Sequence, residues 1–321
     1  MQQEGEKKEL SSLGWLFLVS MVIHVTGSLL MSSIGQVFPN FPVELTLVFS
    51  ELTILIPSII YILIKNLSIK EDLGFRPIKA GSVLMCLLLS ILVTPIASFI
   101  NVLSQLFVSN TMVGMSDELL GGSGIAVWIL ASLYGPFCEE FLFRAIFSNR
   151  YEKYVGPVRA GLISAFFFAI AHMNINQAAY AFVLGVIFSI INKAAGSVYP
   201  SMIVHACING GNMLLLFVMS AAAKSLGGQV DIVASAEAAR VGNTIYFLLG
   251  ITFIAATVCA LIAIPCVVWL SKHEERFEGL LDMFTKKHES ARWLTLPALL
   301  AIIFVLFIMF GLEPVIDLIK G

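Results

Sequence analysis

Nine long apolar blocks constrain this chain more than any other feature of its sequence. A helix that crosses the hydrocarbon core of a bilayer needs about 20 consecutive apolar residues. The blocks lie at residues 13–35, 41–64, 80–108, 122–147, 158–173, 177–193, 198–223, 243–271 and 292–312. The fifth and sixth are short, so the sequence predicts an all-α bundle of eight to nine membrane-spanning helices.

The overall composition leads to the same class of protein. Hydrophobic residues make up 58% of the chain and charged residues only 12%, whereas an average soluble domain is about a quarter charged. The polar stretches between the apolar blocks are short, so no soluble domain is expected. No basic stripe of the kind that binds nucleic acid is present. The expected surroundings are therefore the lipid bilayer, with no nucleic-acid partner.

The placement of lysine and arginine predicts how the bundle is oriented. Positive charge is concentrated in cytoplasmic loops. If the N-terminus lies in the cytoplasm, the outer segments hold only Lys224, Arg240 and Lys320, and Arg144 lies within a span. The inner loops hold Lys7, Lys8, Lys65, Lys70, Arg76, Lys79, Arg150, Lys153, Arg159, Lys193, Lys272, Arg276, Lys286, Lys287 and Arg292. This bias predicts a cytoplasmic N-terminus.

The first of three polar clusters inside the apolar blocks contains two adjacent carboxylates. Ionisable groups within a bilayer are costly, so they indicate function by default. Glu140 and Arg144 are four residues apart and share a helix face, whereas Glu139 points about 100° away from Glu140. Arg144 is therefore expected to neutralise Glu140 and to leave Glu139 free as a general base. Pro136 is expected to kink the helix just before them. The structural alternative is a Glu140–Arg144 pair that only joins two helices.

The second and third clusters each place a histidine beside a residue four positions away. Phe168 and His172 share one helix face, so the phenyl ring is expected to wall the site. His205 and Asn209 share another, and an imidazole with an amide can donate hydrogen bonds to a developing oxyanion. The alternative for each cluster is a structural hydrogen bond between helices.

Small residues recur at four-residue spacing on the two short helices of the centre. They are Gly161, Ala165 and Ala169 on one helix, and Ala181, Gly185 and Ser189 on the next. Such faces let helix backbones approach closely, so these two helices are expected to pack tightly.

Depth in the bilayer is a check on whether the clusters can meet. At a rise of about 1.5 Å per residue from the inner helix ends, Glu139 and His205 lie roughly 12 Å deep and Asn209 roughly 18 Å. His172 lies roughly 21 Å deep by the same count and fits least well. These depths predict one site on the cytoplasmic side of the midplane.

The first two helices carry polar residues of their own. His24 and Glu51 are expected to pair between these helices, in a structural or interfacial role.

The ordered set of motifs resembles the CPBP family. It consists of Glu-Glu-x-x-x-Arg, Phe-x-x-x-His and His-x-x-x-Asn, which are here Glu139-Glu140 with Arg144, Phe168 with His172, and His205 with Asn209. That family, also called Abi, contains CAAX prenyl endopeptidases and bacteriocin-processing or immunity proteins. The resemblance covers the four helices from 122 to 223. It divides the chain into N-terminal helices over 1–121 that wall the cavity, a catalytic core over 122–223, and C-terminal helices over 224–321.

The resemblance implies an intramembrane endopeptidase. Glu139 with His172 would activate a water, His205 and Asn209 would support the oxyanion, and Glu140, Arg144 and Phe168 would support the site. Metal dependence stays open. The chain has no His-Glu-x-x-His helix, which favours direct glutamate catalysis without a cofactor. Zinc is the alternative, because Glu139, His172 and His205 suffice as ligands.

The expected substrate is a peptide or protein with an apolar or lipidated tail, or a leader-bearing peptide, that reaches the site through a cytoplasm-facing cavity. The short loops favour a bacterial cell membrane. Two other functions are weighed against this one. The first is a non-catalytic membrane scaffold or bacteriocin-immunity factor. The second is a proton-coupled transporter, which is the weaker alternative because no matched pair of broken helices is found in two halves of the chain.

Overall fold

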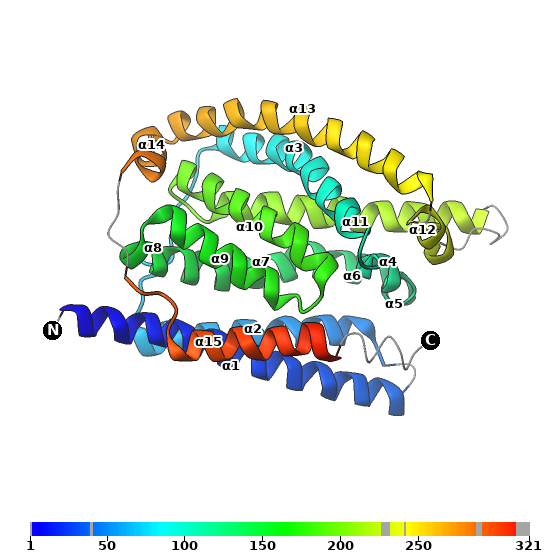
Figure 1. Ribbon diagram of the computed structural model, residues 1–321, viewed down its shortest axis with the longest axis horizontal. Coiled ribbons are helices and arrows are strands. Elements are labelled where there is room, and N and C mark those ends of the chain that lie inside the picture. Colours follow the sequence, from blue (N-terminus) through cyan, green and yellow to red (C-terminus); the bar gives the residue numbers. More distant parts are fainter. Residues whose placement is uncertain (1, 39–40, 226–231, 241, 287–290, 313–321) are drawn as a thin grey trace.

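The computed structural model describes residues 2–38, 41–225, 232–240, 242–286 and 291–312, and this part of the chain is built of helices (Figure 1). The α-helices are α1 Gln2–Val37, α2 Val43–Lys65, α3 Ala80–Ser104, α4 Thr111–Gly114, α5 Ser116–Gly121, α6 Gly124–Ile129, α7 Gly135–Glu140, α8 Asn149–Val155, α9 Pro157–Ala171, α10 Ile175–Ala195, α11 Tyr199–Ser225, α12 Ile232–Arg240, α13 Asn243–His273, α14 Phe277–Thr285 and α15 Leu296–Phe307. Three π-helical segments are η1 Leu130–Tyr134, η2 Phe141–Ser148 and η3 Ile308–Leu312. The predicted all-α fold is confirmed.

Seven helices of the described part are long and apolar enough to cross a membrane. They are Gln3–Val37, Val43–Lys65, Ala80–Ser104, Gly124–Val155, Ile175–Ala195, Tyr199–Ser225 and Asn243–His273. The predicted segments 158–173 and 292–312 form shorter apolar helices, Pro157–Ala171 and Leu296–Gly311. The protein is therefore an integral membrane protein with seven candidate spans, and the count of eight to nine stays a prediction.

The helix that carries the paired carboxylates is interrupted twice by π-helical turns. Helix α6, η1, α7, η2 and α8 follow one another as a single apolar unit over Gly124–Val155, longer than the predicted 122–147. Gly135 donates its N–H to the carbonyl of Leu130, five residues back. Such π-turns are frequent at functional sites because they re-aim side chains within a helix. Glu139 and Glu140 lie between the two of them.

Helices α9 and α10 pack as closely as their small residues predict. A Cβ on Gly185 would lie 2.8 Å from the Cα of Ala165, and one on Gly161 would lie 3.0 Å from the Cβ of Ser189. Contacts this short leave no room for a side chain. The predicted tight packing of these two helices is confirmed.

A buried aromatic cluster joins α1, η2, α8 and α9. It consists of Phe17, Phe143, Phe147, Tyr151 and Phe167, each at most 1% exposed. The rings of Phe17 and Phe167 are 4.5 Å apart, and those of Phe147 and Phe167 are 5.6 Å apart. Edge and tilted contacts of this kind add to the stabilisation from apolar burial.

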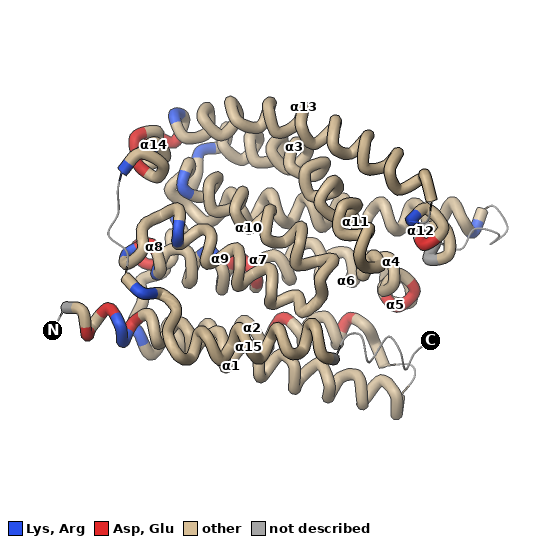
Figure 2. The backbone as a smooth tube through the Cα atoms, viewed as in Figure 1, with Lys and Arg blue, Asp and Glu red and all other residues tan. Residues whose placement is uncertain are grey.

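Basic residues gather at the end of the bundle where the N-terminus, α8 and α14 lie, which we call the basic end (Figure 2). Helices α4, α5 and α12 lie at the opposite end, which we call the far end (Figure 1). Lys287 and Lys320 of the predicted topology lie outside the described residues.

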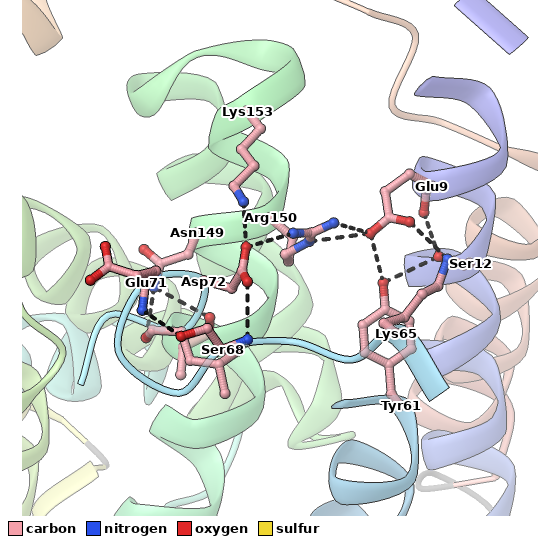
Figure 3. Close-up of polar contacts among 12 residues, drawn as sticks. Glu9, Ser12, Tyr61, Lys65, Ser68, Glu71, Asp72, Asn149, Arg150 and Lys153 are labelled. Carbon is pink, nitrogen blue, oxygen red and sulfur yellow. Dashed lines mark hydrogen bonds and ion pairs between the residues drawn. The ribbon is translucent and has the colours of Figure 1, made fainter. Parts of the chain in front are cut away.

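A polar network ties the helices together at the basic end (Figure 3). Arg150 of α8 donates from Nε to Glu9 Oε1 of α1 over 3.2 Å and from Nη1 to Asp72 Oδ1 over 3.1 Å. Lys153 donates to the same Asp72 oxygen over 2.6 Å, and Lys65 to Glu9 Oε2 over 2.7 Å. The network therefore links α1, α2, the α2–α3 connection and α8.

Candidate active site

Glu140, the last residue of α7, and Arg144 of η2 form a buried ion pair. Their side chains are 0% and 1% exposed, and Arg144 Nε lies 3.3 Å from Glu140 Oε2. The other carboxylate oxygen, Glu140 Oε1, lies 3.1 Å from His205 Nδ1 of α11. The Glu140 carboxylate thus joins its own helix to α11.

Glu139 faces a different environment from its neighbour. Its side chain is 19% exposed, and its two oxygens point at two histidines. His172 Nε2 lies 3.8 Å from Oε1, and His205 Nε2 lies 3.5 Å from Oε2. The structure therefore brings together Glu139, His172 and His205, including the histidine whose depth fitted least well. The helical count failed because it took residue 147 as the inner end of the carboxylate helix. That helix runs to Val155, so Glu139 lies deeper than counted and closer to the depth of His172.

Hydrogen bonds to the other ring nitrogens orient both histidines. His172 Nδ1 lies 2.9 Å from the Phe168 carbonyl oxygen. Because a carbonyl only accepts, Nδ1 donates in this bond, and Nε2 faces Glu139. His205 Nδ1 faces the Glu140 carboxylate, which accepts in the same way.

Phe168 contacts both the buried Arg144 guanidinium and the two histidine rings. The Arg144 guanidinium carbon is 4.2 Å from the centre of the Phe168 ring and 5.2 Å from that of Phe188. The Phe168 ring meets those of His172 and His205 edge-on at 4.9 and 5.8 Å. Cation–π contacts stabilise a desolvated guanidinium, so the two phenyl rings help to hold Arg144.

Asn209 lies on the same wall as His205 and is tied to the neighbouring π-turn. Its Nδ2 donates to the carbonyl oxygen of Ala131, in η1, over 3.3 Å. The side-chain amide has two N–H groups, so one remains for another acceptor.

Glu139, His172, His205 and Asn209 all line one cavity of about 670 Å³. Its walls come from α1, α2, α3, α4, α5, α9, α10, α11 and the helix of the paired carboxylates. A space of this size is typical of a ligand-binding site.

A comparison of the chain with protein-family models identifies its central segment. Residues 121–211 match the model described as type II CAAX prenyl endopeptidase Rce1-like. This segment is an Rce1-like domain. The match covers less than half of the chain, but it includes every motif residue of the candidate site. The resemblance stated from the motifs is thus confirmed, and the family of the Rce1-like domain is one of peptidases.

The family model is the match on which the identification of this segment rests. No curated protein and no solved structure matches the chain.

Two ionisable residues outside the Rce1-like domain also face the cavity. His24 and Glu51 belong to its lining, and Glu51 Oε2 is buried with no hydrogen-bond partner among the described residues. The predicted His24–Glu51 pair is not what the structure has, because His24 Nδ1 lies 2.8 Å from Thr53 Oγ1. Their position inside two apolar helices was the signal for a place beside the site.

The arrangement of the candidate zinc ligands bears on the metal alternative. Within the described ranges, no three His, Cys, Asp or Glu side chains are arranged to hold a metal ion. Glu139, His172 and His205 as placed here do not fit a zinc site.

Proposed function

We propose that this protein is an intramembrane endopeptidase that hydrolyses a peptide bond with Glu139 as the general base. One observation carries the proposal. Glu139 presents its carboxylate to a cavity between two imidazole Nε2 atoms, at 3.8 and 3.5 Å, while its neighbour Glu140 is fully buried in an ion pair. The Rce1-like domain in which these residues lie supports the same reaction class.

The water-activating step uses His172 as the neutral ring with its proton on Nδ1. A water that lies off the line between Glu139 and His172 Nε2 can donate to both acceptors. Glu139 takes one proton from this water as its oxygen attacks the carbonyl carbon of the scissile bond, and the carbonyl electron pair moves to its oxygen. The C–N bond then breaks, and the proton held by Glu139 passes to the leaving nitrogen. The products are a carboxylic acid and an amine.

His205 and Asn209 are the proposed donors to the oxyanion. In its protonated form His205 donates Nδ1–H to Glu140 and Nε2–H into the cavity, beside Glu139. Asn209 adds its remaining N–H. Donors that are fixed before the reaction stabilise a developing negative charge without reorganising.

Glu140, Arg144 and Phe168 act as positioning residues. Glu140 orients the His205 ring through Nδ1, and Arg144 neutralises Glu140 in the low-dielectric interior. Phe168 lies against Arg144 and both histidine rings.

The division of the chain, its spans and its substrate class are also part of the proposal. We take 1–121 as helices that wall the cavity, 122–223 as the catalytic core and 224–321 as C-terminal helices. We also place α9 and α15–η3 in the bilayer, which gives nine spans with the N-terminus in the cytoplasm of a bacterial cell. The substrate class is a peptide with an apolar or lipidated tail, or a leader-bearing peptide. Access to the site from the cytoplasm stays a prediction from the sequence.

The test is cleavage of a membrane-associated peptide library by the purified protein in liposomes. We expect wild type to cleave with and without a strong metal chelator, and His205→Ala to cleave far more slowly. Glu278→Gln, an exposed glutamate on α14, serves as the matched control and should cleave like wild type. Activity that the chelator removes and zinc restores would replace direct glutamate catalysis by the zinc alternative. The scaffold alternative would be favoured if wild type cleaved no peptide and His205→Ala still supported whatever cellular phenotype depends on the protein.

A further inference from the structure

We infer that the cavity receives its substrate from the extracytoplasmic side of the membrane, through the far end of the bundle. The inference rests on the proposed function for the nature of the substrate, but its structural part concerns only where the cavity lies and which end of the bundle is basic.

Each long helix lines the cavity with the part that is remote from the basic end. Helix α2 reaches the basic end at its last residue, Lys65, and lines the cavity over 47–54. Helix α3 leaves the basic end at Ala80 and lines it over 94–101. Helix α11 does so from His205 to Met219. The catalytic groups therefore form one end of a hollow that extends toward the far end.

The lining continues to the surface at the far end. Thr111 and Met112 of α4, and Met115 and Leu119 beside and within α5, belong to it. Figure 1 shows α4 and α5 at the end of the bundle opposite the N-terminus. These short helices thus form the mouth of the cavity.

Packed side chains close the opposite direction. Phe141, Phe143 and Phe147 are 8%, 1% and 0% exposed. The ring of Phe75, in the α2–α3 connection, lies 5.8 Å from that of Phe141 and 5.7 Å from that of Tyr199. Beyond this aromatic layer, the network of Figure 3 joins α1, α2 and α8. A peptide cannot reach Glu139 from the basic end without unpacking this core.

The placement of positive charge indicates which side of the membrane the far end faces. Lysine and arginine gather at the basic end (Figure 2), and positive charge favours the cytoplasmic side. The mouth therefore faces outward. This replaces the sequence-based expectation of cytoplasmic access, which counted the depth of the catalytic groups from the inner helix ends. Depth locates those groups but does not say on which side of them the bundle is hollow.

The lining also limits what can enter. Among the described residues, the lining includes the carboxylates of Glu51 and Glu139 and no lysine or arginine, so it disfavours additional negative charge on the substrate. Amide side chains that can bond a peptide backbone are present at Asn101, Asn174, Gln177, Asn209 and Asn212. The substrate class that fits is an uncharged internal segment of an exported peptide, or of the outer part of a membrane protein.

The test is thiol labelling from either side of the membrane. Single cysteines are placed at Met115→Cys in the mouth, Asn212→Cys deeper in the cavity, and Lys70→Cys at the basic end, in a background whose five native cysteines are replaced by serine or alanine. A membrane-impermeant maleimide reacts with thiolates that water reaches. Leu214→Cys is the matched control, because Leu214 is 57% exposed on the same helix as Asn212 but does not line the cavity.

We expect Met115→Cys and Asn212→Cys to react in intact cells, Lys70→Cys to react only after permeabilisation, and Leu214→Cys to stay unlabelled in both. Reaction of Met115→Cys or Asn212→Cys only after permeabilisation, or of Lys70→Cys in intact cells, would overturn the inference. If the cysteine-free protein does not fold, the same substitutions in the wild-type background are assigned by peptide mapping. The same labelling is also measured in Glu139→Gln protein, so that the side of access is determined separately from cleavage. If the labelling is as expected but wild type cleaves no peptide, the proposed function is contradicted and the inference about the side of access still holds.

Discussion

Two adjacent glutamates in one helix have opposite surroundings. Glu140 is enclosed by Arg144 and His205, whereas Glu139 reaches a cavity. The difference arises because neighbouring residues on a helix point about 100° apart. Sequence spacing alone predicts this division, and the structure adds that both carboxylates contact the same imidazole, on opposite nitrogens.

Replacement of the buried carboxylate should lower stability more than any change at the cavity surface. Glu140→Gln leaves the Arg144 guanidinium in the interior without its counter-charge, and breaking a buried ion pair in this way costs about 3–5 kcal/mol. Thermal unfolding in detergent should show a clear fall in Tm for Glu140→Gln and none for the exposed Glu278→Gln. Equal Tm values for the two variants would contradict the positioning role of Glu140.

The sequence could predict those site residues that belong to a motif of characteristic residue types and spacing. Glu139, His172 and His205 were each identified by type and spacing, but their convergence depends on how four helices pack. For Glu51 and His24 the sequence predicted a pair between the first two helices, in a structural or interfacial role. Only the three-dimensional arrangement places them in the wall of the cavity.

At the scale of helices, apolar length predicted the long elements and missed their irregularities. Helices α2, α3, α10, α11 and α13 follow the predicted blocks within a few residues. The π-turns η1 and η2 could not be predicted, because an apolar helix has no polar face whose phase would reveal an extra residue in a turn. The short helices α4, α5, α12 and α14 lie in stretches that the sequence assigned to loops.

The contact between α9 and α10 depends on a missing side chain. In Gly185→Ala the new Cβ would lie 2.8 Å from the Ala165 backbone and 3.1 Å from Arg144 Nη2. The helices must separate, and overpacking of this kind costs about 1–3 kcal/mol. Circular-dichroism melts should place Tm of Gly185→Ala well below wild type, with Gly250→Ala unchanged because nothing lies within 4 Å of that position. A Gly185→Ala protein that melts like wild type would mean that this contact is looser than described.

At the scale of the whole molecule, the bundle has one sealed, basic end and one hollow end. The polar network of Figure 3 fastens the basic end through side chains from four segments. The far end carries the mouth of the cavity and few cations. Fold and charge thus divide the molecule into a part that holds the catalytic groups rigidly and a part that admits a substrate.

The network at the basic end should make stability depend on pH. The hydrogen bond from Lys153 holds the pKa of the Asp72 carboxyl below its ordinary value of 3.8, with further contributions from the Ser68 amide and from Arg150. Because the folded-state pKa is the lower one, the stabilisation is present above about pH 4 and is lost as the pH falls through the folded-state pKa. Asp72→Asn should therefore cost about 1 kcal/mol at pH 7, and the difference from wild type should shrink as the pH falls below about 4.

Paired unfolding curves of wild type and Asp72→Asn at several pH values measure this difference directly. Titration of other carboxylates affects both proteins and cancels. A difference that persists unchanged at pH 3 would show that Asp72 contributes by packing and not by charge.

The most direct test of the account is the rate of peptide cleavage by Glu139→Gln, measured beside its Tm. Glutamine preserves the shape of the side chain but cannot take a proton from water. We predict a wild-type Tm together with loss of cleavage by a factor of at least about 10². A Glu139→Gln protein that folds normally and cleaves the same peptide at the wild-type rate would contradict the central claim that Glu139 is the base of an intramembrane peptidase.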